Sequence, residues 1–136
     1  MSIDPWPSVT LTSTERCVTA HSGAVLLRDV MGAVGLVSTL DATLGLKQRA
    51  RGLSEGQFVA ALAESIALGA SCLDDLAVAR ADEGQELLRG FAVPAPQTAG
   101  TWLRRFTLGH IGQLTKAMAT LQRRAYELMG IGHLAR

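Results

Sequence analysis

The feature that most limits how this chain can fold is a single long amphipathic segment, residues 107–129. No proline interrupts it, and its apolar residues recur at alternating spacings of three and four: Ile111, Leu114, Met118, Leu121, Ala125 and Leu128. This spacing places the apolar side chains on one stripe of an α-helix, as in the seam of a coiled coil. The sequence therefore predicts a long helix that packs along this seam against other helices.

The rest of the chain also has helical periodicity, divided into short segments by glycine and proline. Ser54 and Gln57 have the spacing of a capping box and predict the start of a helix. Hydrophobic residues make up 48% of the chain and aromatic residues only 4%, which favours helices with an aliphatic core over a β-sandwich. Helices are predicted over residues 23–34, 36–44, 54–68, 83–89, 97–106 and 107–129, and from residue 71 or 72 onward.

The predicted fold class is all-α or nearly so. We expect a multi-helix bundle with a helix-turn-helix-like segment and a long C-terminal helix. A short β-hairpin or extended arm is predicted near the N-terminus, where Val and Thr alternate weakly. The predicted parts are an N-terminal arm (residues 1–21), a helical domain (residues 22–129) and a C-terminal tail (residues 130–136).

Nothing in the sequence predicts a secretory signal or a membrane span. The longest apolar run, residues 23–40, is interrupted by Arg28 and Asp29 and is too short and too charged to cross a bilayer. Cys17 and Cys72 fit no metal-ligand spacing, and we expect both to be small buried side chains in a reducing compartment. The predicted location is therefore the cytoplasm.

No pattern of residues predicts catalysis. Asp74 and Asp75 are adjacent, so on a helix they point about 100° apart and cannot converge on one substrate or metal ion. We expect them to be charged residues near the N-terminus of a helix, where acids are favourable. The three histidines, His21, His110 and His133, have no metal-ligand spacing, and no phosphate-binding or nucleophile motif is present.

Charge is distributed unevenly along the chain. From Gln97 to Arg136 there are six basic residues and one acidic residue, a net charge of +5, whereas residues 1–96 carry seven basic and eleven acidic residues, a net charge of −4. The overall net charge of +1 therefore conceals a basic segment beside an acidic body. This pattern is typical of a soluble domain that turns one face toward a polyanion, usually nucleic acid. The alternative is that both segments are merely solvated faces of helices.

The last part of the segment 71–106 indicates where DNA would bind. After a turn bounded by Pro94 and Pro96 comes a short predicted helix, residues 97–106, in which Trp102, Leu103 and Phe106 form the inward face. A recognition helix needs short polar side chains near base edges and arginines that reach guanine or phosphate. The alternative is an ordinary amphipathic helix. The predicted contacts are Gln97, Thr98, Thr101, Arg104 and Arg105, with Lys116, Arg123 and Arg124 as secondary phosphate contacts.

Three short motifs follow one another along the chain. They are Leu68-Gly69-Ala70-Ser71-Cys72-Leu73-Asp74-Asp75-Leu76, then Arg80-Ala81-Asp82, then Pro94-Ala95-Pro96-Gln97-Thr98-Ala99-Gly100-Thr101-Trp102-Leu103-Arg104-Arg105-Phe106. Over residues 22–129 their order and spacing resemble the N-terminal region of DDE transposases from bacterial insertion sequences. The resemblance implies a helical part that binds the ends of the element and aids dimerisation. It implies double-stranded DNA as a partner, with a second copy or an intact transposase as another, and a location on the bacterial nucleoid.

In that family an RNase-H-like domain follows, in which three carboxylates bind two divalent metal ions such as Mg²⁺ and catalyse strand cleavage and transfer. This chain ends at Arg136, where such a domain would begin. We therefore expect a truncated transposase without catalytic residues, bound metal or other cofactor of its own, and no activity from this chain alone. Two alternatives stay open from the sequence: a helical homo-oligomerisation module, or an inert remnant.

Overall fold

The computed structural model describes residues 19–46 and 51–131. Within these ranges it contains seven α-helices, one short 3₁₀-helix and no β-strand, which confirms the predicted all-α class for this part of the chain. The predicted hairpin lies almost entirely outside the described residues. The helices are α1 (Ala24–Ala33), α2 (Leu36–Thr43), α3 (Glu55–Ala67), the 3₁₀-helix η1 (Leu73–Asp75), α4 (Leu76–Ala81), α5 (Glu83–Arg89), α6 (Pro96–Leu103) and α7 (Leu108–Leu128).

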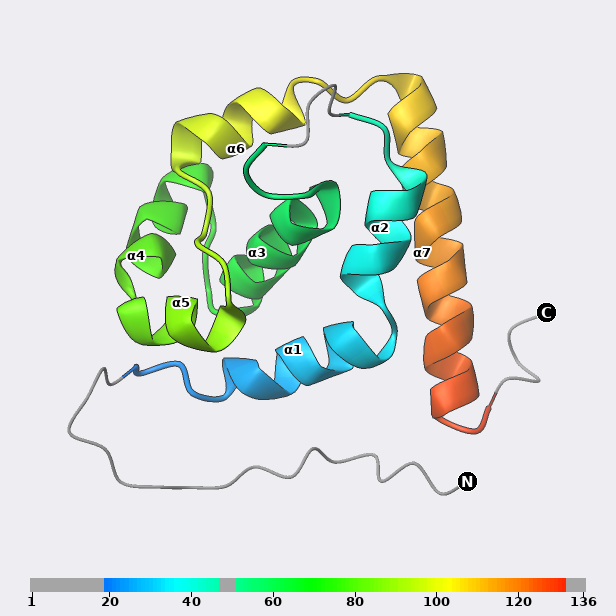
Figure 1. The fold of residues 1–136 in the computed structure, drawn as a ribbon, viewed down its shortest axis with the longest axis horizontal. Helices are drawn as coiled ribbons and strands as arrows, with labels where there is room; N and C mark the ends of the chain where they lie inside the picture. The colour runs from blue at the N-terminus through cyan, green and yellow to red at the C-terminus, as the bar shows by residue number, and fades with distance from the viewer. Residues whose placement is uncertain (1–18, 47–50, 132–136) are drawn as a thin grey trace.

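The helices are arranged around α3, which lies in the middle of the fold (Figure 1). On one side α2 lies beside α3, and α7 lies beyond α2 at the edge of the molecule; α4 and α5 lie on the opposite side. In the same view α1 runs below α3 and α6 runs above it. Because α2 packs extensively on both α3 and α7, it connects the long C-terminal helix to the rest of the fold.

The core is mostly aliphatic, as the composition predicts, but an aromatic group joins α3 to α6. The ring of Trp102 stacks on Phe58 with centroids 4.9 Å apart, and Phe106 packs edge-on against Trp102 at the same centroid distance. The indole Nε1–H of Trp102 donates a hydrogen bond to Glu55, the first residue of α3. Of the three residues predicted to face inward, only Leu103 is exposed (41%), because the packed face of α6 is centred on its neighbour Trp102.

The backbones of α2 and α3 approach so closely that the contact requires glycine. A Cβ atom on Gly56 would lie 2.4 Å from the carbonyl oxygen of Val37 and 2.5 Å from its Cα. The N–H of Gly56 also donates to Asp41 Oδ1, 2.7 Å away. The predicted capping box is confirmed just before it: Gln57 N–H donates to Ser54 Oγ, and Ser54 N–H donates to Gln57 Oε1. These bonds fix both the start and the position of α3.

The seam predicted for α7 is only partly buried. α7 packs mainly on α2, and the face that packs includes Leu114, Ala117 and Leu121. Ile111 and Met118 belong to the same predicted seam, yet each is 52% exposed. The reason is that one neighbouring helix covers only part of the circumference of α7, and the covered face is centred near Ala117 rather than on the seam.

Helical periodicity also predicts an inward stripe with Leu26 and Val30 in residues 23–34, and another with Phe58, Leu62 and Ile66 in residues 54–68; both are less buried than predicted. Leu26 and Val30 of α1 and Ile66 of α3 all lie largely exposed to solvent. In α3 the neighbouring positions Glu64 and Ser65 are buried instead. A periodicity argument assigns apolar residues to the core, so it misses a helix whose packed face contains a charged group.

The helix predicted from residue 71 or 72 is divided into η1 and α4. Hydrogen bonds from the backbone N–H groups of Ser71 (2.7 Å) and Cys72 (3.1 Å) to the Asp75 carboxylate fix the start of η1. These bonds, that from Ser71 first, hold the pKa of Asp75 below its ordinary value. Asp75 thus has the helix-end role expected for it. Cys72, predicted to be buried, is exposed, because it lies in the turn that precedes η1.

Candidate nucleic-acid interface

The helix predicted to contact DNA is present as α6, but it begins earlier than predicted. Pro96 occupies its first position, where the missing N–H carries no cost, and Ala95 is the N-cap. Gln97 and Thr98 therefore lie in the first turn, and neither caps the helix. Thr101 lies one turn later and its hydroxyl donates to Gln97 O, 2.9 Å away. The side chains of all three polar residues are exposed, as predicted.

The prediction that Arg104 and Arg105 lie on this helix is wrong. α6 ends at Leu103, and both arginines belong to the turn that leads to α7. The helix stops here because the chain must turn before α7, whose N-cap Thr107 has an extended backbone. Both arginines are exposed, so the end of α6 is still basic.

Beside α6 the surface is hollowed into a pocket of about 580 Å³. Its described lining includes three arginines and no Asp or Glu, and we call it the arginine-lined pocket. A concave surface with several positive charges and no acid attracts an anion more strongly than the same charges on an open surface. The polar and charged residues that line it are Arg51, Arg80, Gln97, Thr98, Thr101 and Arg105.

Four of these six residues were predicted as contacts, and the fold brings them together; Arg104 does not line the pocket. Arg51 and Arg80 were missed because they come from the part of the sequence that is acidic overall. Arg51 precedes α3, and Arg80 lies on α4, where its Nη1 donates to Val93 O at 3.0 Å. The sequence has a basic cluster before Gly52, formed by Lys47, Arg49 and Arg51, which offered a signal for Arg51. No sequence pattern places Arg80 beside α6.

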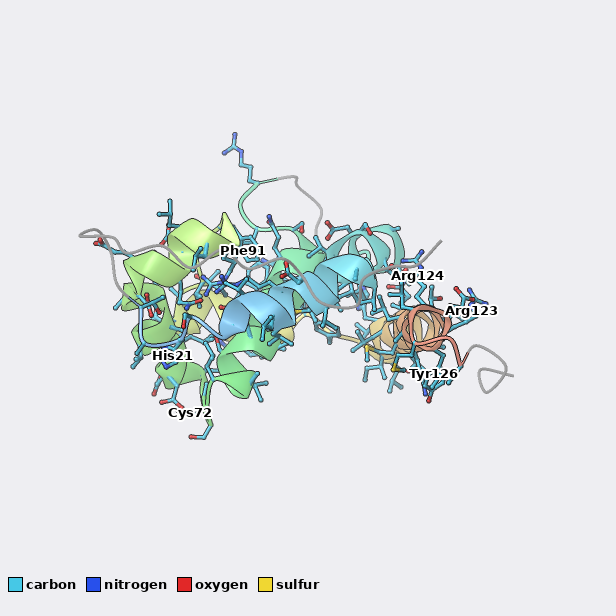
Figure 2. The ribbon with its side chains drawn as sticks, turned by 90° about the horizontal axis from the view of Figure 1, so that it is seen from below. His21, Cys72, Phe91, Arg123, Arg124 and Tyr126 are labelled. Atoms are coloured by element: carbon cyan, nitrogen blue, oxygen red, sulfur yellow. The ribbon has the colours of Figure 1, made fainter. Side chains whose placement is uncertain are left out.

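The predicted secondary contacts on α7 differ from one another. Lys116 and Arg123 are exposed, and Arg123 projects away from the rest of the fold (Figure 2). Arg124 is engaged within the fold, because its Nη1 donates to Val34 O at 3.1 Å and to the hydroxyl of Thr39 at 2.7 Å. Arg124 therefore fastens α7 to the junction of α1 and α2, a structural role that the sequence did not predict.

Other arginines are buried around an acid on the far side of α3. Glu64 is 1% exposed, and its carboxylate accepts hydrogen bonds from Arg28 at 2.8 Å and from Arg89. Arg28 also donates to Gln85. We call Arg28, Glu64, Gln85 and Arg89 the ionic cluster. Burial alone would raise the pKa of Glu64, but the hydrogen bonds and charges of the two arginines outweigh it and hold that pKa below its ordinary value.

The described residues of the arginine-lined pocket include no histidine, cysteine or carboxylate. Across residues 19–46 and 51–131, no three His, Cys, Asp or Glu side chains lie close enough together to hold a metal ion. No helix in those ranges has the length and apolar character that crossing a membrane requires.

Comparisons of the chain with protein-family models, with curated proteins and with solved structures find no match. The fold and the pocket therefore define the chain only by class, as an all-α domain with a basic concave surface beside α6. The resemblance to DDE transposases rests on the order of the sequence motifs alone.

Proposed function

We propose that this chain binds double-stranded DNA, as the N-terminal helical part of an insertion-sequence transposase does when it recognises the ends of its element. The observation that carries this proposal is the arginine-lined pocket. Its three arginines come from three separate parts of the chain, and no acid is found among its described lining residues. This is the composition expected for a site that receives the phosphates of a nucleic acid.

The shape of the pocket suggests how the contacts divide. Phosphate contacts position a protein on DNA, whereas side chains that reach base edges supply sequence preference. Arg80 and Arg105 line the hollow and are the candidates for phosphate contacts. Gln97 and Thr98, in the first turn of α6, are then the candidates for contacts with bases or sugars. Lys116 and Arg123 on α7 extend the contact to neighbouring phosphates, and a protein of this kind would act on the nucleoid.

The test is fluorescence anisotropy with two labelled duplexes, one with the terminal repeats that flank the gene and one with a scrambled sequence, over a series of salt concentrations. If about five phosphates are neutralised, the logarithm of the binding constant should fall against the logarithm of salt concentration with a slope of about −4 to −5. Stronger binding to the repeats would support recognition of the element's ends. No binding to either duplex by a folded protein would overturn the proposal.

The residues are tested by the double substitution Arg104→Ala and Arg105→Ala. We expect binding to weaken by about 2–4 kcal/mol, since a good arginine contact contributes about 1–3 kcal/mol and neighbouring contacts are not additive. The matched control places the same change of net charge elsewhere, by Ala42→Glu and Ala77→Glu at exposed positions of α2 and α4. Equal losses of DNA affinity in the two double variants would mean that binding depends on the net charge of the protein and not on the position of the arginines.

A further inference from the structure

α7 has an exposed face that no described helix covers. Besides its packed face, one side of the helix carries Leu108 (87% exposed), Ile111 and Met118 (52% each) and Met129 just after the last turn (60%). These residues recur at helical spacing together with exposed Thr115 and Gln122, so they lie on one line along the helix. We call Leu108, Ile111, Thr115, Met118, Gln122, Tyr126 and Met129 the outer stripe.

The outer stripe contains no charged residue. The charged residues of α7, Lys116, Arg123, Arg124 and Glu127, recur at i, i+7, i+8 and i+11 and fall outside the stripe, on another flank of the helix. Figure 2 shows Arg123 and Tyr126 projecting from different sides of α7. The polar groups of the stripe are partly satisfied within it, since Gln122 Nε2 donates to the hydroxyl of Tyr126 at 2.9 Å.

This pattern restricts what can cover the stripe. A partner with a charged face would have its charges desolvated without a counter-charge on α7, which is costly. The two adjacent exposed leucines of α5, Leu87 and Leu88, lie beside Glu83 and Glu86 and so fail this criterion. The uncharged face that matches the outer stripe is the same stripe on a second copy.

We infer that two copies of this chain associate through the outer stripes of α7, with the two helices antiparallel and crossing near Met118. The stripe is nearly symmetric about this residue: Leu108 lies ten positions before it and Met129 eleven positions after it, and the polar Thr115 and Gln122 lie three before and four after. An antiparallel pair therefore brings Leu108 of one copy near Met129 of the other, and Thr115 near Gln122. Antiparallel helix dipoles also attract each other, whereas parallel ones repel.

Such a contact is self-complementary and closes as a two-fold dimer. A single helix pair is small for an interface, so the association should be weak. It leaves Lys116 and Arg123 outside the contact, on another flank of the helix. The inference does not depend on DNA binding, because it uses a different face of α7 and different residues.

Sedimentation velocity from about 1 to 200 μM protein, the range expected for a small interface, tests the association. We expect the wild-type chain to change from monomer to dimer within this range. Ile111→Gln with Met118→Gln should shift the midpoint at least about tenfold, which corresponds to about 1.4 kcal/mol, while circular dichroism stays unchanged. The matched control is Leu87→Gln with Leu88→Gln, an equally apolar exposed pair on α5, which should leave the midpoint where it was.

Cysteine cross-linking tests the orientation, in a background with Cys17→Ser and Cys72→Ser. Met118→Cys should form a disulfide dimer on mild oxidation. Leu108→Cys and Met129→Cys should each fail alone, yet cross-link to each other when the two variants are mixed, because a disulfide requires Cβ atoms about 3.5–4.5 Å apart.

Three results would overturn the inference. The first is a wild-type protein that stays monomeric at every concentration. The second is a dimer that the α7 substitutions do not weaken more than the α5 control does. The third is self-cross-linking of Leu108→Cys, which would show parallel helices. If dimerisation fails while anisotropy still shows DNA binding, the inference about α7 is wrong and the proposed function stands.

Discussion

The ionic cluster and the arginine-lined pocket both gather arginines from separate helices, yet they present opposite environments. In the cluster, Arg28 and Arg89 surround the buried carboxylate of Glu64. In the pocket, Arg80 is held by the backbone carbonyl of Val93, and no carboxylate occurs among the described lining residues. In the first arrangement one carboxylate pairs with both arginines, whereas the described lining of the second contains no carboxylate.

The difference shows that charge counted along the sequence does not give the charge of a surface. Two arginines from the acidic part of the chain, Arg28 and Arg89, are used internally. Two others from the same part, Arg51 and Arg80, line the pocket beside α6. The basic surface is therefore assembled from both halves of the charge pattern, and the partner of each arginine decides which role it has.

The largest loss of stability is expected from a substitution in the ionic cluster. Glu64→Gln removes the buried negative charge and leaves two buried guanidinium groups without a counter-charge. Breaking a buried ion pair in this way costs about 3–5 kcal/mol of unfolding free energy. Urea denaturation followed by circular dichroism measures it. As a control, Glu86→Gln on the exposed side of α5 should change stability by less than about 0.5 kcal/mol. Equal effects of the two substitutions would show that the cluster does not stabilise the fold.

A smaller loss of stability is expected when the pH is lowered. Because the pKa of Glu64 is lower in the folded state than its ordinary value of 4.5, the unfolded state binds the proton more readily. The stabilisation is complete above that ordinary value and is lost as the pH falls through the lowered pKa. Urea denaturation at several pH values between 7 and 3 should show the gap between wild type and Glu64→Gln narrowing as the pH falls below about 5. A gap independent of pH would contradict the role given to the carboxylate.

The smallest effects are expected from substitutions of two adjacent arginines on α7, one of which should affect stability and the other DNA binding. Arg124→Ala removes hydrogen bonds to Val34 and Thr39 and should lower stability by about 0.5–1.5 kcal/mol. Arg123→Ala should leave stability within about 0.5 kcal/mol but reduce the salt dependence of DNA binding by about one unit of slope. Denaturation and anisotropy on the same two proteins make the comparison. The reverse result would exchange the roles of the two residues.

The helical segments and their boundaries were largely predictable, because they depend on local signals. The capping box at Ser54 and the glycines and prolines between segments act within a few residues of where they occur. The face that each helix buries was less predictable, as Ile66 and Met118 show, because it depends on which neighbour covers the helix. No local sequence pattern predicts that α7 packs mainly on a single helix, α2.

For the candidate site, the exposed polar face of α6 followed from the sequence, whereas the pocket did not. Arg51 and Arg80 lie far from Thr98 in the sequence, and only the packing of α3 and α4 against α6 brings them together. Arg124 illustrates the opposite case, a predicted ligand contact whose guanidinium is used inside the fold. Its partners Val34 and Thr39 are about 85 to 90 positions away.

The contact between Gly56 and Val37 has a mechanical consequence. Because backbone meets backbone there, main-chain atoms set how closely α2 approaches α3. α7 packs on α2, and α6 is joined to α3 through the bond between Trp102 and Glu55. The placement of α7 relative to α6 therefore depends on this contact, and any side chain at position 56 would push α2 and α3 apart.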